Sequence, residues 1–198
     1  MISSVTCQNY RSLEQVTVPT GALTALVGPN GAGKTSILRA IDLVLGNRWP
    51  SLASIQVPED FTVFDSTREL SVTVDFDPPL VHEDTLKKIH EICALQVRCR
   101  PYKKSGTWGD IGDLHLDFDP LNAKRELPQV AVGAAPGGKP MFRPLNVSSG
   151  LRDQARVLFI DHRSSTEPGA TPPVYARLDP RATSCTGAKR VRGACSGR

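Results

Sequence analysis

The stretch LTALVGPNGAGKTSILRAI, residues 23–41, decides the fold of this chain of 198 residues. Within it, residues 28–35 match the pattern G-x-x-x-x-G-K-[ST] at every fixed position. Such a loop needs glycines because its backbone must curl until successive N–H groups point inward at phosphate oxygens. The apolar stretch before the loop predicts a short strand over 22–28, and the pattern after it predicts a helix.

The loop supplies most of the candidate binding residues. Lys34 is expected to reach the outer phosphates of a nucleotide, and the Thr35 hydroxyl to bind Mg²⁺. The helix beginning near Gly33 adds the positive end of its dipole. Arg11 is expected to approach the nucleotide from a neighbouring turn, with a solvated turn residue as the alternative. The predicted cofactors are ATP and Mg²⁺, and the candidate nucleotide-binding residues are Gly28, Pro29, Asn30, Gly31, Ala32, Gly33, Lys34, Thr35, Ser36 and Arg11.

The segments nearest the loop predict a mixed α/β domain. Residues 2–19 alternate in part and are rich in Val and Thr, so they predict two strands that turn around 9–12. After the loop, apolar residues recur at spacings of 3 and 4, which predicts an amphipathic helix that Gly46 caps. Its expected apolar residues are Ile37, Leu38, Ile41, Val44 and Leu45.

Further along, residues 47–61 read as a proline-punctuated loop and residues 68–79 as a half-buried strand stopped by Pro78 and Pro79. Residues 82–96 predict a helix with acidic residues early and apolar ones on one face. Two more strands are predicted at 97–103 and 113–120, loops at 128–146 and a buried strand at 155–161.

Composition places the chain among ordinary globular proteins, with 39% hydrophobic and 22% charged residues. Acidic and basic residues are equal in number up to Arg163, so the net charge of +4 falls entirely in the tail, 164–198. The tail is poor in aromatic residues, and we expect it to be disordered.

The five cysteines form no C-x-x-C pair, and we expect reduced thiols. Without a signal sequence or a long apolar run, a cytoplasmic protein without a membrane segment is predicted. His82 and His90, eight residues apart on the predicted helix, are too distant to share a metal.

Together with GPNGAGKT, the N-terminal stretch ISSVTCQNYRSLEQVTV resembles the ABC-type ATPases that act on DNA, the RecF, SMC and OLD (overcoming lysogenization defect) families. Residues 9–12 match the NFRS-like turn of these families. The segments PEDF at 58–61 and LFIDHRSS at 158–165 look like those of OLD-family ATP-dependent endonucleases, and the resemblance covers residues 1–163. It implies an α/β P-loop NTPase, an ABC-ATPase-like N-terminal lobe with a mixed sheet and additional antiparallel strands.

The resemblance also implies a function. It predicts ATP binding, with hydrolysis as a further step, in a DNA repair or phage-defence nuclease system. DNA is an expected partner in the full-length family context, and a homodimer would sandwich the nucleotide. Two alternatives stay open: a nucleotide-binding remnant or regulatory partner without turnover, and the nucleotide-binding subunit of an ABC transporter, in which Tyr10 would stack on the base.

Several family features are not seen in the sequence. VLFID, residues 157–161, has the form of a magnesium-site strand, but His162 follows where a catalytic Glu would stand, so Asp161 is not favoured as a metal ligand. Ser148–Gly150 look like an ABC signature but lie too close to Asp161, and we interpret them as a chance match. No catalytic residue is assigned. The domain organisation expected is a partial ATPase domain over 1–163 and a basic tail over 164–198, as in a truncated or frame-shifted gene product or a fragment.

Overall fold

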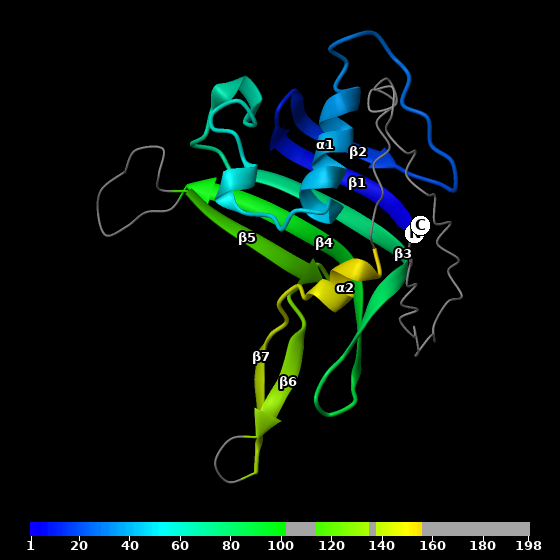
Figure 1. Cartoon of the computed structure of the whole chain (residues 1–198), viewed down its shortest axis with the longest axis vertical. Coiled ribbons are helices and arrows are strands. Elements are labelled where there is room, and N and C mark those ends of the chain that lie inside the picture. The colour runs from blue at the N-terminus through cyan, green and yellow to red at the C-terminus, as the bar shows by residue number, and fades with distance from the viewer. Residues whose placement is uncertain (102–113, 135–137, 156–198) are drawn as a thin grey trace, which may run out of the picture. The chain divides into compact units, whose positions relative to one another are not determined.

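The computed structural model describes residues 1–101, 114–134 and 138–155. The main element is a five-stranded antiparallel sheet in the order β2-β1-β3-β4-β5 (Figure 1). Its strands are β1 Ile2–Tyr10, β2 Leu13–Pro19, β3 Leu70–Glu83, β4 Ile89–Pro101 and β5 Leu114–Leu121. A second sheet holds β6 Gln129–Ala134 and β7 Pro140–Pro144, and the helices are α1 Lys34–Leu45 and α2 Ser149–Asp153, with 3-10 turns η1 Leu52–Ser54 and η2 Thr62–Phe64. A mixed α/β domain is therefore confirmed.

The hairpin of β1 and β2 confirms the two predicted strands and the turn between them. Val5 pairs with Val18 and Tyr10 with Leu13 in antiparallel register. Alternate residues of β1 are buried because β1 lies between β2 and β3 with α1 packed against it. The turn holds Arg11 in the left-handed region at φ 54°. The hairpin thus carries Arg11 and Ser12 to one end of the sheet.

Helix α1 packs on one face of the sheet, as predicted from its apolar spacing. Ile37, Val44 and Leu45 are buried and contribute to the core beside β1, β3 and β4. Gly46 ends the helix, with its N–H donating to the Asp42 carbonyl at 2.8 Å. Leu38 departs from the prediction, because it is 48% exposed on the side of the helix turned away from the sheet.

The strand predicted before the glycine-rich loop is not formed. In the described part of the chain, residues 22–27 pair with no strand of either sheet. Leu23 is 94% exposed and Val27 91% exposed, and Leu26 alone of the three packs against the core. The prediction was wrong because apolar residues give a segment strand preference, whereas a ladder needs a neighbouring strand to accept its hydrogen bonds.

The helix predicted over 82–96 is also wrong. These residues form the end of β3, a turn and the start of β4, with His82 opposite His90. Asp84 holds the turn, since its carboxylate accepts the backbone N–H groups of Leu86 and Lys88 at 2.9 and 3.0 Å. The helical spacing of the apolar residues was outweighed by β-branched Ile89 and Ile92 and by pairing with β3.

The prolines of β3 bend the strand rather than stop it. Register shifts between Asp75 and Leu80, so Pro78 and Pro79 lie in an irregularity where no ladder donor is needed. Both faces of the first half of β3 are buried, with α1 packed against the strand and side chains such as Gln96 lying over Thr73, so the prediction of a half-buried strand was wrong there. The predicted loop at 128–146 was wrong as well, since it contains β6 and β7, which pair around a bulge at Gly133. The strands predicted at 97–103 and 113–120 are confirmed over their described residues as parts of β4 and β5.

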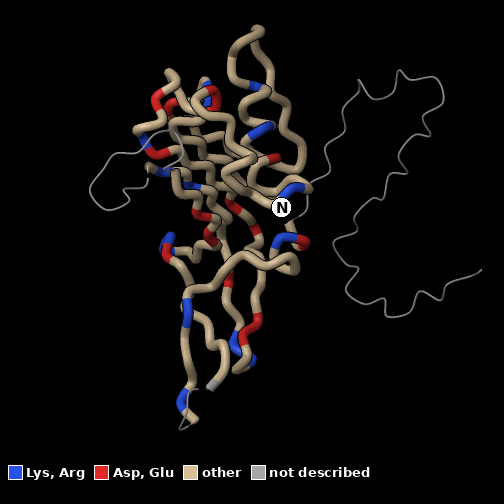
Figure 2. The backbone as a smooth tube through the Cα atoms, turned by 60° about the vertical axis from the view of Figure 1, so that its left-hand side comes forward, with Lys and Arg blue, Asp and Glu red and all other residues tan. Residues whose placement is uncertain are grey.

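Charges of both signs are interspersed over the described residues (Figure 2). On β4 and β5 they pair directly, as Arg98 does with Asp119 at 2.8 Å and Arg100 with Asp117 at 3.2 Å.

The residues that the structure describes include no helix long and apolar enough to cross a membrane. Residues 156–161 of the last predicted strand, and the tail 164–198, lie outside the described residues.

Candidate functional site

The glycine-rich loop, residues 28–35, joins the segment before it to α1 through two left-handed glycines. Gly31 has φ 83° and Gly33 φ 86°, a region that side chains disfavour. Gly33 has a second constraint, because a Cβ atom there would lie 2.8 Å from Leu13 Cδ2. The loop therefore needs glycine at 33 for its backbone conformation, and a Cβ there would also displace the end of the Leu13 side chain.

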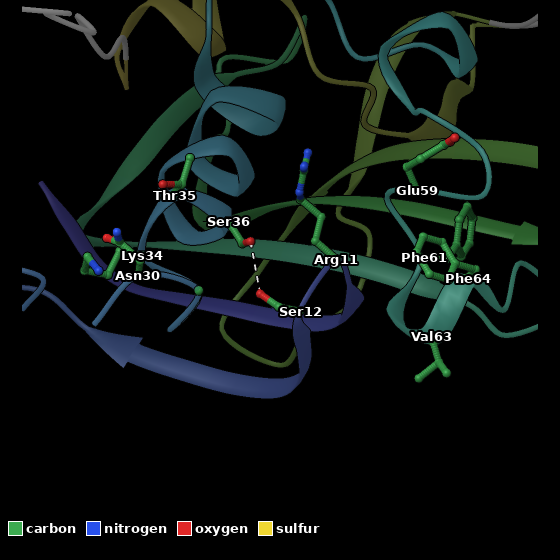
Figure 3. Close-up of a pocket in the computed structure, with 12 residues that line it drawn as sticks. Arg11, Ser12, Asn30, Lys34, Thr35, Ser36, Glu59, Phe61, Val63 and Phe64 are labelled. Atoms are coloured by element: carbon green, nitrogen blue, oxygen red, sulfur yellow. Dashed lines mark hydrogen bonds between the residues drawn. The ribbon is translucent and has the colours of Figure 1, made fainter. Parts of the chain in front are cut away.

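Lys34 begins α1 and lies across the loop. Its ammonium donates to the carbonyls of Gly28 at 2.7 Å and Pro29 at 2.6 Å. Thr35, next in the helix, is exposed. Ser36 is buried, and its hydroxyl lies 3.2 Å from that of Ser12 (Figure 3). That contact ties the first turn of α1 to the β1–β2 turn.

A cavity of about 490 Å³ brings these groups together. Its lining includes most of the predicted residues: Arg11, Asn30, Gly31, Gly33, Lys34, Thr35 and Ser36. Gly28, Pro29 and Ala32 do not line it, although the carbonyls of Gly28 and Pro29 hold the Lys34 ammonium. The remaining lining residues are Ser12, Glu59, Phe61, Val63 and Phe64, none of which was predicted from the sequence.

Arg11 lies on the cavity wall and is bound to Asp60. Its guanidinium donates to Asp60 Oδ1 at 2.9 Å, and its backbone N–H donates to the Asp60 carbonyl at 2.8 Å. Asp60 is buried, and its second carboxylate oxygen accepts the Gln56 N–H at 2.8 Å. The solvated turn residue that was the alternative for Arg11 is thus not what the structure shows, since the Arg11 side chain is 27% exposed and paired.

Val63 and Phe64 form the wall of the cavity that sequence reasoning missed. Both have left-handed backbones, with φ 56° and φ 58°, although neither is glycine. Such conformations cost roughly 1–2 kcal/mol per residue. Despite this strain, the side chains are 81% and 68% exposed. The sequence offered a weak signal, since two large apolar residues stand one place beyond the PEDF segment, just after the stretch 47–61 that was predicted to be a loop.

Tyr10 does not contribute to this cavity. It is 3% exposed at the end of β1, and burial, with a smaller contribution from the Asp60 charge, raises the pKa of its hydroxyl to about 12. It is therefore a neutral, packed residue. This position does not support the stacking role that the ABC-transporter alternative gave to Tyr10.

Other candidate residues have structural partners. Ser148 caps α2, with its hydroxyl accepting the Leu151 N–H at 3.2 Å, and Gly150 lies within that helix. His90 lies 3.0 Å from the Asp84 carboxylate. Among the residues that the structure describes, no group of three or more His, Cys, Asp or Glu side chains is placed to hold a metal. Asp161 and His162 lie outside these residues.

The structure combines a glycine-rich loop, a lysine at the start of a helix and a cavity that both line. These features indicate an ATPase domain. Residues 1–120 match the family described as the AAA ATPase domain, and the chain belongs to this family.

The chain is also similar to an OLD nuclease of Thermus scotoductus, with 43% identity over 163 residues, which confirms the resemblance to the OLD family. The match covers 82% of this chain and 27% of the relative, so the chain spans about a quarter of the length of that protein.

Proposed function

We propose that the chain binds ATP together with Mg²⁺ in the cavity beside the glycine-rich loop. The observation that carries the proposal is the convergence of Lys34, Thr35 and the left-handed glycines 31 and 33 on one cavity. Triphosphate is the ligand to which this chemistry is suited, because a loop of backbone donors and a helix N-terminus favour several negative charges at once.

The binding step is an exchange of partners at Lys34. Its ammonium has three donors and already makes two hydrogen bonds to the carbonyls of Gly28 and Pro29. Phosphate oxygens are charged acceptors and make stronger bonds than neutral carbonyls do. The lysine therefore moves from the loop carbonyls to the phosphates when the ligand enters.

Thr35 suits Mg²⁺, since its hydroxyl is exposed in the cavity wall next to Lys34. Magnesium in nucleotide sites takes few protein ligands and completes its shell with phosphate oxygens and water. Bound there, the ion would neutralise part of the phosphate charge. Arg11 lies on the same wall, where the paired Asp60 carboxylate holds its guanidinium and balances its charge.

ATP hydrolysis in a DNA-acting system is the wider form of the proposal. It is supported by the AAA ATPase family and by the similarity to an OLD nuclease. In this form the protein is cytoplasmic, a homodimer encloses the nucleotide through the P-loop, or Walker A, site of an ABC-type lobe, and the whole protein acts on DNA in repair or phage defence.

Binding without turnover is the second candidate, and one observation favours it. Among the residues that line the cavity, Glu59 is the one with a carboxylate side chain. It lies at the end of the cavity away from Lys34 (Figure 3). Hydrolysis needs a group that orients water at the terminal phosphate. A transporter subunit is less favoured, because Tyr10 is buried.

The test is a melting curve with and without Mg-ATP, followed by phosphate release under steady-state conditions. We expect ATP to raise the melting temperature, and Lys34→Ala to abolish that rise. Lys139→Ala removes an exposed lysine outside the cavity and serves as the matched control. A rise that persists in Lys34→Ala would refute binding at the loop, and a rise without phosphate release would favour the second candidate.

A further inference from the structure

The tip formed by Val63 and Phe64 lies at the opposite end of the cavity from Lys34 (Figure 3). Both side chains are large and apolar, and both are mostly exposed. Their left-handed backbones are strained, and strained residues of this kind persist where the surrounding structure holds them, often at ligand sites. The tip therefore needs an explanation that burial in the core does not provide.

The residues just before the tip fix its position. Phe61 is 1% exposed in the core and forms a bridge with Tyr10 of β1. The Thr62 hydroxyl donates to the Leu13 carbonyl at 3.2 Å. Together with the Arg11–Asp60 pair, these contacts join the tip to the same hairpin that contacts α1 through Ser12. The two ends of the cavity are thus joined to the same β1–β2 hairpin.

The cavity has a polarity along its length. At one end Lys34 and the loop glycines favour phosphate, and at the other the Glu59 carboxylate disfavours it beside an exposed aromatic ring. A ligand with a charged end and a flat, uncharged end fits this arrangement in one direction. Aromatic side chains bind the faces of nucleobases by stacking, and every base presents such a face.

We propose that Phe64, supported by Val63, is the platform on which the base of the nucleotide stacks. The inference rests on the proposed function and adds to it the residue that holds the base. The ligand class that follows is a nucleoside triphosphate rather than inorganic polyphosphate. A purine is preferred over a pyrimidine, because the larger ring system covers more of the Phe64 face.

The test compares two ligands that share a triphosphate and differ in the base. Dissociation constants for Mg-ATP and for inorganic tripolyphosphate with Mg²⁺ are measured on the full chain and on Phe64→Ala, Phe64→Tyr and Phe142→Ala. Phe142 is an exposed aromatic residue, 58% accessible on β7, and does not line the cavity. Melting curves without ligand establish that each variant is folded, which the exposure of Phe64 favours.

We expect Phe64→Ala to raise the dissociation constant for ATP about tenfold, equal to about 1.4 kcal/mol, and to leave that for tripolyphosphate unchanged. Phe64→Tyr keeps an aromatic face and should bind ATP like the parent chain, as should Phe142→Ala. CTP should bind more weakly than ATP to the parent chain, and this difference should shrink in Phe64→Ala.

Three results would overturn the inference in distinguishable ways. If ATP binds and needs Lys34 but Phe64→Ala has no effect, the base platform is wrong and the proposed function stands. If Phe64→Ala weakens ATP and tripolyphosphate equally, Phe64 shapes the phosphate end and is not a base platform. If the parent chain binds neither ligand, the proposed function fails and the inference fails with it.

Discussion

Arg11 and Asp60, 49 residues apart in sequence, are joined twice, by a side-chain ion pair at 2.9 Å and a backbone hydrogen bond at 2.8 Å. The double contact links the β1–β2 turn to the loop that carries Glu59 and Phe64. Two walls of one cavity are therefore joined by this pair, together with the Phe61–Tyr10 and Thr62–Leu13 contacts.

Asp60→Ala should destabilise the fold by about 1–3 kcal/mol, since it removes the buried carboxylate that accepts hydrogen bonds from the Gln56 N–H and the Arg11 guanidinium. Arg11→Ala should cost less, because the Arg11 side chain is partly exposed. Urea unfolding of both single variants and of the double variant measures the coupling between them. Strictly additive losses would contradict a direct interaction.

Gly33→Ala should destabilise the protein by about 1–2 kcal/mol, because alanine disfavours φ 86°, and the end of the Leu13 side chain would have to shift away from the new Cβ. Gly21→Ala is the control, since a Cβ there has open space and the residue is not left-handed. Urea midpoints for the two variants make the comparison. Equal midpoints would show that the loop at 33 can relax, against the conformation described.

Leu45→Ala should cost about 2–5 kcal/mol, since Leu45 is 2% exposed and its removal leaves a cavity in the core under α1. Leu38→Ala on the same helix should cost far less, because Leu38 is 48% exposed. Denaturant unfolding compares the two. A similar loss in both variants would indicate that Leu38 is buried in solution, for instance by self-association, and sedimentation at several concentrations would detect this.

Asp84→Asn should change how stability depends on pH. The hydrogen bond from His90, followed by backbone N–H groups, lowers the pKa of Asp84 below its ordinary value, and burial opposes this in part. A carboxylate whose pKa is lower in the folded state stabilises the fold above its unfolded pKa, about 3.9, and this stabilisation is lost as pH falls through the folded pKa. The parent chain should therefore lose stability below about pH 4.

The stability gap between the parent chain and Asp84→Asn should be widest near neutral pH and should narrow in acid. Urea unfolding at a series of pH values from 7 to 2 gives this gap directly. Asp153→Asn alters an exposed aspartate and should follow the parent chain at every pH. A gap that stays constant across the series would mean that the charge on Asp84 is not what stabilises the turn.

Local patterns predicted those parts of the fold that local physics controls. The strands at 2–19 and the helix after the glycine-rich loop were predicted because alternation and helical spacing are properties of short windows. The helix predicted at 82–96 was wrong because the same apolar residues suit a helix or a strand. Pairing with β3 decided in favour of the strand. The strand predicted at 22–28 was wrong for the opposite reason. These residues have a strand preference, but the described residues include no strand that pairs with them.

The candidate site was predicted in the same uneven way. The loop residues carry a pattern that fixes their chemistry, and Lys34, Thr35 and Ser36 do lie together on one cavity. Ser12 lies in the turn that resembles the family pattern but was not predicted to line the site, and Phe64 carries no pattern of its own. Their position depends on long-range contacts such as Arg11–Asp60, which composition and spacing do not reveal.

The exposed residues Leu23 and Val27 have a consequence for the affinity of the loop that follows them. A strand that paired with residues 22–27 would bury these two side chains and hold the entrance of the loop in place. Such pairing would order the loop before the nucleotide arrives. The free energy of nucleotide binding would then no longer include the entropic cost of ordering the loop. Strand addition and nucleotide binding would then be thermodynamically linked, and each would strengthen the other by the same factor.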